Sequence, residues 1–280
     1  NISSEIKGKL FISRSQTIFN VANGPAVNDL LIRAVLDDGF GFLGDKGSIR
    51  KAGTGRLLLT GDNLYQGDTI LAGGVLGING TQANQRVRVF DGTLIGEGDA
   101  RNIIQIGGIL NPGIGAGILD ASQSANLSEN TRFQVQLNGR NVGSQFDQLR
   151  TETLILGSAA TAPTLDVKLG FTPNINDSFR IINVLGAGVL PANRVFRDVA
   201  GNLLPEGASF QVDGLNFTIS YRGGNGNDVV ITRNVPPAFE NITITPEINE
   251  GERVFVTGTI TEPDPDNTFF LDVDWGDGTP

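Results

Sequence analysis

Residues 51–76 read KAGTGRLLLTGDNLYQGDTILAGGVL, and this stretch decides the fold. It contains two copies of a short step in which a glycine and one variable residue precede a leucine, and two further copies follow. The four steps are Gly55-Arg56-Leu57, Gly74-Val75-Leu76, Gly92-Thr93-Leu94 and Gly108-Ile109-Leu110, and their glycines lie 19, 18 and 16 residues apart. A period of this length is too short for a βαβ unit and is typical of one coil of a parallel β-helix.

In such a coil each leucine is expected to stack on the last, about 4.8 Å away, the spacing of paired strands. The glycines are expected to turn the corners with positive φ, where a Cβ would clash. A β-sandwich with irregular hairpins is the alternative.

Strand-length runs bounded by Gly, Asn and Asp support a β-rich chain. Residues 29–36 are interpreted as a strand because their flanks leave too little length for a helix. These runs are 9–13, 17–22, 29–36, 56–60, 86–90 and 102–106.

The composition sets limits on the core and on the chemistry. Only 39% of the 280 residues are hydrophobic and 38 are glycine, which suits a long, thin core in which each coil buries a few side chains. The chain has no Cys, His or Met, so it offers no disulfide, no thiolate ligand and no imidazole base. Few oxidisable side chains suit an extracellular protein.

The charge balance is acidic, with a net charge of −9 and a pI of about 4.6. This balance disfavours nucleic acid and anionic membranes as partners, because both need basic surface, and it is compatible with cation binding. No apolar run approaches the ~18 residues of a membrane-spanning helix, so no membrane span is expected in this fragment.

The same stretch resembles the autotransporter-associated β-strand repeat, whose pattern runs roughly K-x-G-x-G-x-L-x-L-x-G-x-N-x-Y-x-G-x-T-x-I-x-x-G-x-L. The departures are Leu64, where the family usually has threonine, and Asp68, which replaces a small residue. The matching positions are Lys51, Gly53, Gly55, Leu57, Leu59, Gly61, Asn63, Tyr65, Gly67, Thr69, Gly74 and Leu76, and Ile70 lies one residue before the isoleucine of the pattern.

Downstream segments also look like the ends of such arrays, so the resemblance covers most of residues 25–233. It implies a passenger-type parallel β-helix on a bacterial surface or in a large secreted protein, and it implies no reaction. We therefore expect a right-handed parallel β-helix over residues 1–233 whose last part folds as an irregular cap. The segments that carry this resemblance are 108–113, 133–139, 146–149, 165–171, 177–182 and 220–232.

The character of the sequence changes at NVPPAF, residues 234–239, where two prolines indicate a linker over 234–238. Residues 239–280 alternate as strands, at 241–245, 252–260 and 269–275. Their ending DVDWGDGT, residues 272–279, resembles the signature of polycystic-kidney-disease (PKD) domains, which are immunoglobulin-like sandwiches. Such a sandwich needs about seven strands, so this segment is expected to be a truncated module.

Acidic residues concentrate in this last segment and form a candidate calcium site. Calcium takes about six to eight oxygen ligands, which closely spaced carboxylates supply. Asp272 and Asp274 alternate along a strand and would share one face. The alternative is solvated turn chemistry, with Asp277-Gly278 as a tight turn. The candidate calcium ligands are Glu250, Asp264, Asp266, Asp272 and Asp274, with Asp277 beside them.

A second candidate lies in residues 223–230, GGNGNDVV, which fit a calcium-binding nonapeptide once. That motif works by stacking, so one copy supplies half a site. We favour a glycine-rich turn in which Asp228 hydrogen-bonds the loop backbone.

Catalysis by paired carboxylates is disfavoured, because the acids of the repeats are scattered and match no common spacing. Asp62 is interpreted as a turn residue. The separation of Asp68 and Asp91 does not match the coil period. Glu97 and Asp99 flank a glycine in a loop.

Together these observations predict a non-enzymatic structural or adhesive rod of a large secreted bacterial surface or matrix protein, able to form filaments. Its expected partners are other copies of itself, neighbouring modules of the same protein and surface glycans. The alternative function is a polysaccharide-binding or polysaccharide-degrading β-helix protein.

Overall fold

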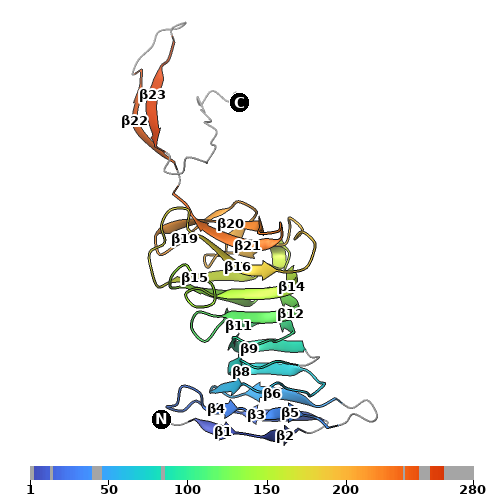
Figure 1. Cartoon of the computed structure of the whole chain (residues 1–280). Helices are drawn as coiled ribbons and strands as arrows, with labels where there is room; N and C mark the ends of the chain where they lie inside the picture. The colour runs from blue at the N-terminus through green and yellow to red at the C-terminus, as the bar shows by residue number, and fades with distance from the viewer. Residues whose placement is uncertain are drawn as a thin grey trace.

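A computed structural model describes residues 3–12, 15–39, 46–82, 86–235, 237–245 and 253–261. Nearly all the regular structure is β-strand, and 19 of the described strands join in one sheet system that winds along the molecule. Figure 1 shows these strands stacked in order from the N-terminal end to a closed upper end. All strand pairings among the described residues of 48–112 are parallel, which excludes the β-sandwich alternative there and identifies a β-helix-like solenoid.

The coils have three faces, which follow from the pairing of the strands. β8 and β9 each run around one corner, so their two halves belong to different faces. The first face contains β3 (Gln16–Asn20), β6 (Ser48–Ala52), the first halves of β8 (Thr69–Ile78) and β9 (Arg86–Gly96), β10 (Asn102–Gln105), and the second halves of β12 (Ile118–Leu127) and β14 (Gln148–Leu156).

The second face contains β1 (Ser4–Ile6), β4 (Leu30–Ile32), β7 (Arg56–Leu59), the second halves of β8 and β9, β11 (Gly108–Pro112), β13 (Thr131–Leu137), β15 (Thr164–Leu169) and β17 (Phe196–Arg197). The third face contains β2 (Lys9–Phe11), β5 (Val35–Asp37), the first halves of β12 and β14, and β16 (Ser178–Val184). Between β5 and β12 this face is held by single bridges such as Asn63 with Gln82 and Asp99 with Asp120.

The expected leucine row runs through the core of the second face. Leu57 is in register with Leu76, Leu76 with Leu94, and Leu94 with Leu110, and all four side chains are fully buried. The row continues upward through Phe133 and Leu165 as the coils lengthen. Burying one such side chain stabilises the fold by about 1.5–3 kcal/mol, so the row is a main source of cohesion between coils.

Two local expectations need correction. Residues 29–36 form two strands, β4 and β5, because the amides of Arg33 and Ala34 both donate to the carbonyl of Ile6 and the chain turns a corner there. Gly55 has no positive φ, unlike Gly74 at +68°. Gly55 is required instead by close approach, since a Cβ there would lie 2.3 Å from the carbonyl oxygen of Ala22.

The upper end is closed by antiparallel strands, as expected for a cap. β21 pairs antiparallel with β16, and β20 pairs with both β19 and β21. Aromatic rings cover the last coil: Phe133 stacks on Phe196 with centroids 5.9 Å apart, and Phe196 stacks on Tyr221 at 6.4 Å. The remaining elements of this end are a 3-10 turn (Ala159–Thr161), β18 (Leu203–Leu204), β19 (Ser209–Val212), β20 (Leu215–Gly223) and β21 (Asp228–Arg233).

A separate two-stranded antiparallel sheet follows, made of β22 (Ala238–Ile244) and β23 (Val256–Thr261). These strands overlap two of those expected in 239–280, whereas the expected strand 269–275 lies outside the described residues. An immunoglobulin-like sandwich is not shown, because two described strands do not make one. The three-residue 3-10 turn is the one helical element described, and no helix in the described part of the chain could cross a membrane.

Candidate functional site: the repeat coil and the groove beside it

Lys51 is the buried charge of the repeat coil. It alternates inward from β6 and is fully buried. Its Nζ donates to the carbonyl oxygens of Ala52 at 2.9 Å, Gly53 at 2.8 Å and Gly73 at 3.0 Å, so all three ammonium hydrogens have acceptors. Burial lowers the pKa of this ammonium, and the nearby carboxylate of Asp29 acts in the opposite direction. Lys51 therefore ties a corner of its own coil to the corner of the next.

Gly74 occupies the same corner one coil above. Its φ is +68°, and a Cβ there would lie 2.4 Å from the carbonyl oxygen of Gly53 and 2.7 Å from Nζ of Lys51. No side chain fits between two backbones that approach so closely. The lysine and glycines of the repeat pattern are thus parts of one contact across two coils.

The third face of the repeat coil is held by buried amide and hydroxyl groups. The side-chain oxygen of Asn63 accepts from the backbone N–H of Leu36 in the coil below, at 2.9 Å, and the backbone N–H of Asn63 donates to the carbonyl oxygen of Thr81 in the coil above. Tyr65 is buried, contacts Thr69 Oγ1 and donates to Gln82 Oε1 at 2.8 Å. Burial raises the pKa of the Tyr65 hydroxyl, which stays protonated and able to donate. Both Asn63 and Tyr65 therefore connect coils.

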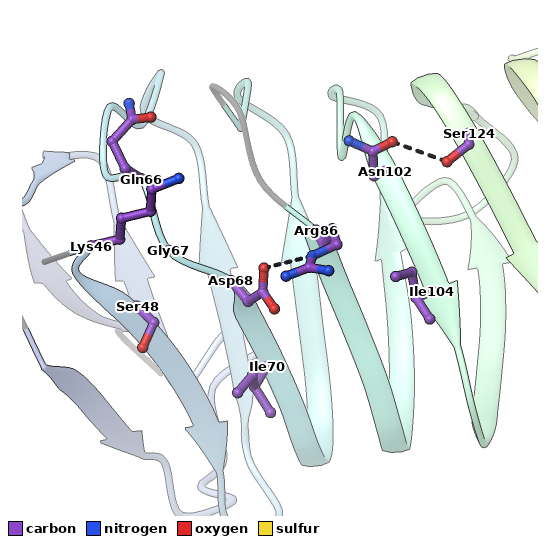
Figure 2. Close-up of a pocket in the computed structure, with 10 residues that line it drawn as sticks. All are labelled: Lys46, Ser48, Gln66, Gly67, Asp68, Ile70, Arg86, Asn102, Ile104 and Ser124. Atoms are coloured by element: carbon purple, nitrogen blue, oxygen red, sulfur yellow. Dashed lines mark hydrogen bonds and ion pairs between the residues drawn. The ribbon is translucent and has the colours of Figure 1, made fainter. Parts of the chain in front are cut away.

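An open groove of about 650 Å³ lies on the outer surface of the first face. Figure 2 shows its lining residues on successive strands and on the segments that lead into them, with Asp68 and Arg86 near the centre. The groove is lined by Lys46, Ser48, Gln66, Gly67, Asp68, Ile70, Arg86, Asn102, Ile104 and Ser124.

The groove lining has one acidic side chain, Asp68, and two basic ones, Lys46 and Arg86, with Arg50 and Arg88 in the outward row beside it. Asp68 forms ion pairs with Nε of Arg86 at 3.1 Å and with Nη1 of Arg88 at 3.5 Å. Arg50 lies in the same outward row as Arg88, separated from it by Ile70. Sequence reasoning did not identify this surface. The segments RVRVF (86–90) and SIRKA (48–52) contain the signal, which is a basic residue at alternate positions of a strand, since alternate residues face the same side.

The acids of the repeats do not converge within the described residues. Asp62 accepts hydrogen bonds from the backbone amide and the hydroxyl of Thr81 in the next coil, so it connects two coils and does not close a local turn. Asp91 accepts from the amide of Gly92, and Asp99 accepts from the amides of Arg101 and Ser122. No group of three or more metal-binding side chains occurs in the described part of the chain.

Asp228 differs from its expected role. The turn 223–226 is closed by its own backbone, with the amide of Gly226 donating to Gly223. The carboxylate of Asp228 is buried and instead accepts from the amide of Val184 on β16 at 2.7 Å, and it pairs with Arg180 at 3.2 Å. It therefore fastens the cap to the last coil.

Asp147 is a second buried carboxylate, whose role was not predicted from the sequence. Its two oxygens accept from the backbone amides of Gly117 at 3.0 Å, just before β12, and of Gln136 at 2.7 Å, on β13. Burial raises its pKa to about 7, although the two amides act in the opposite direction. The candidate calcium ligands Glu250, Asp264, Asp266, Asp272 and Asp274, with Asp277, all lie outside the described residues.

Comparison with known proteins bears on the repeat coil directly. Residues 49–78 match the family model of the Passenger-associated-transport-repeat, which confirms the resemblance of this coil to an autotransporter passenger repeat. The chain is also 26% identical over 204 residues to an extracellular serine protease of Serratia marcescens. That alignment covers 61% of this chain and 20% of the relative, so the chain spans about a fifth of the relative's length.

Proposed function

We propose that this chain is an extracellular passenger segment whose stacked coils form a stiff shaft that spaces or anchors other modules at a bacterial surface or in a matrix. The observation that carries the proposal is the unbroken series of parallel registers through the leucine row, from Leu57 to Leu165. Each strand satisfies its backbone groups through the strands above and below, and this arrangement resists bending and proteolysis.

Two findings support an extracellular location. One is the passenger repeat at 49–78, and the other is the similarity to a relative described as extracellular. The winding is inferred to be right-handed, because parallel crossovers almost always are.

We propose no catalytic role for these residues. The relative is described as a serine protease, but the 280 residues of this chain contain no histidine and cannot build a Ser-His-Asp triad among themselves. The carboxylates of Asp62, Asp99, Asp147 and Asp228 are used by backbone amides, which supports a structural use of the acids.

A distance measurement tests the shaft. The chain has no cysteine, so cysteines introduced at exposed Ser4 and Gln211 would be its only sites for spin labels. A rigid stack predicts one narrow distance distribution. Deleting residues 77–94 joins Leu76 to Ile95 in register, and it should shorten that distance by about 5 Å, one strand spacing.

The matched control deletes residues 77–85, which removes half a coil and breaks the register. This variant should lose the narrow distribution and become sensitive to protease. A broad distribution in the unaltered chain, or identical behaviour of the two deletions, would reject the shaft.

The lower end of the stack is proposed to dock another coil. Among the described strands, β1 pairs only with β4 and β2 only with β5, so each has a second edge at which another strand could pair. The partner would be a neighbouring module or a second copy of the chain, which is a route to filaments. Analytical ultracentrifugation at rising concentration tests self-association, and a monomer at every concentration would reject the second copy.

The acidic segment 250–277 is proposed to bind calcium within a PKD-like module. Carboxylates at Asp272 and Asp274 support this on chemical grounds. Calorimetric titration of the full chain with calcium tests it, with Asp272→Asn/Asp274→Asn as the variant, and an unchanged titration in the variant would reject these ligands.

A further inference from the structure

We propose that the groove on the first face binds an acidic polysaccharide chain lying along the axis of the stack. The ligand class is a polymer of sugars that carry carboxylate or sulfate groups. This binding activity uses the stacked coils, and it does not depend on the proposed role of the stack in spacing or anchoring other modules.

The arrangement of arginines carries the proposal. Neighbouring strands place Ile18, Arg50, Ile70, Arg88 and Ile104 in one outward row, each in register with the next. Arg50 and Arg88 are two strands apart, which corresponds to about 10 Å along the axis. An extended polymer with regularly spaced anionic groups can meet both arginines at once.

The basic groups have spare capacity for a ligand. Among the described residues, no carboxylate lies within ion-pair distance of Lys46 or Arg50. The Arg88 side chain is partly exposed, and its Nη1 lies 3.5 Å from Asp68, at the long end of ion-pair distances. Guanidinium groups bind carboxylate or sulfate oxygens through paired N–H donors, so these side chains suit acidic sugars.

The local charge opposes that of the whole chain. Lys46, Arg86 and Asp68 line the groove, Arg88 also pairs with Asp68, and Arg50 lies in the outward row beside the lining residue Ile70, in a chain whose net charge is −9. A polyanion is therefore attracted to this groove and repelled by the acidic chain as a whole. The charge complementarity is local and directs the ligand to the first face.

The neutral lining favours a saccharide over a nucleic acid. Ser48, Gln66, Asn102 and Ser124 supply hydroxyl and amide groups that can exchange hydrogen bonds with sugar hydroxyls. The ten lining residues include no aromatic ring, and the exposed Phe90 beside them has the Arg88 guanidinium 5.8 Å from its ring centroid, so the described surface of the groove offers no series of free rings to successive bases of a single strand.

The experiment measures binding of the full chain to polygalacturonate, dextran sulfate and neutral dextran by calorimetry. We expect binding to one or both acidic polymers at about 0.05 M salt, strong weakening at about 0.5 M, and none to dextran. The two acidic polymers distinguish carboxylate from sulfate recognition. Equal binding to neutral dextran, or equal binding to a single-stranded oligonucleotide, would overturn the proposal.

The variant Arg50→Gln/Arg88→Gln removes both positive charges of the outward row and leaves the Arg86–Asp68 ion pair in place. It should bind at least about tenfold more weakly, because two charge-assisted contacts are lost. The matched control Arg222→Gln removes an exposed arginine from β20 in the cap and should bind as the unaltered chain does. Unchanged binding by the double variant, or equal loss in the control, would reject the site.

A second variant guards against misfolding. Ser48→Glu adds a negative charge to the groove lining without removing an arginine, and it should also weaken binding while thermal unfolding stays unchanged. Full binding by a folded Ser48→Glu protein would count against the groove.

Discussion

Replacing Lys51 by methionine tests whether one buried ammonium holds two coils together. Methionine has a similar length and apolar stem but no donor, so the change removes three hydrogen bonds from Nζ. The carbonyl of Ala52 keeps the amide of Val21 at 2.9 Å. The carbonyl oxygens of Gly53 and Gly73 lose the donor that both accept from, which is Nζ of Lys51.

The expected cost follows from these two carbonyls. Leaving a buried acceptor without a donor costs about 1–3 kcal/mol, and both glycines are half-buried, so the lower part of this range applies to each. Removing the buried charge recovers part of that cost, because the ammonium no longer has to be desolvated. We therefore expect Lys51→Met to lower the free energy of unfolding by about 2 kcal/mol.

Chemical denaturation followed by circular dichroism measures the change, and amide hydrogen exchange locates it. In a solenoid each coil contacts only its neighbours, so exchange should quicken in residues 49–78 and stay unchanged in the cap. Lys46→Met is the matched control, because Lys46 is exposed and bears the same side chain. Stability of Lys51→Met within about 0.5 kcal/mol of the control would refute the reasoning.

Three further predictions concern the core, the cap and pH. Leu94→Ala should cost about 2–5 kcal/mol in denaturant unfolding, whereas the exposed Leu64→Ala should cost little; similar losses would contradict the row. Phe196→Ala should cost about 3–5 kcal/mol and increase dye binding to the exposed upper core, and unchanged dye binding would contradict the role of the cap. The pKa of Asp147, about 7 when folded, exceeds the ~3.9 of an unfolded aspartate, so the folded chain holds the extra proton between these values. The stabilisation from the extra proton should be complete below about pH 4 and should be lost as the pH rises to about 7. Over this range the free energy of unfolding should fall by at most about 4 kcal/mol more than that of the Asp147→Asn variant. A difference between the two proteins that is constant with pH would contradict this pKa.

The sequence by itself determined the architecture of the stack. A glycine, a variable residue and a leucine recur at nearly one coil length, and each Leu57-type side chain can be buried only against its counterparts in adjacent coils. The residues of the repeat coil, including Lys51, Asn63 and Tyr65, were also visible as a pattern. Their partners were not, because a pattern of spacings does not say which backbone atom a side chain reaches.

Tertiary structure alone decided the groove and the buried carboxylates. Arg50 meets Ile70, and Ile70 meets Arg88, only after three coils are stacked in register. Asp147 and Asp228 bond to amides in other strands and loops, at Gly117 and Val184. The physical reason is the varying coil length: each corner and loop resets which residues become neighbours, so side-chain contacts between coils are fixed by register and not by distance along the chain.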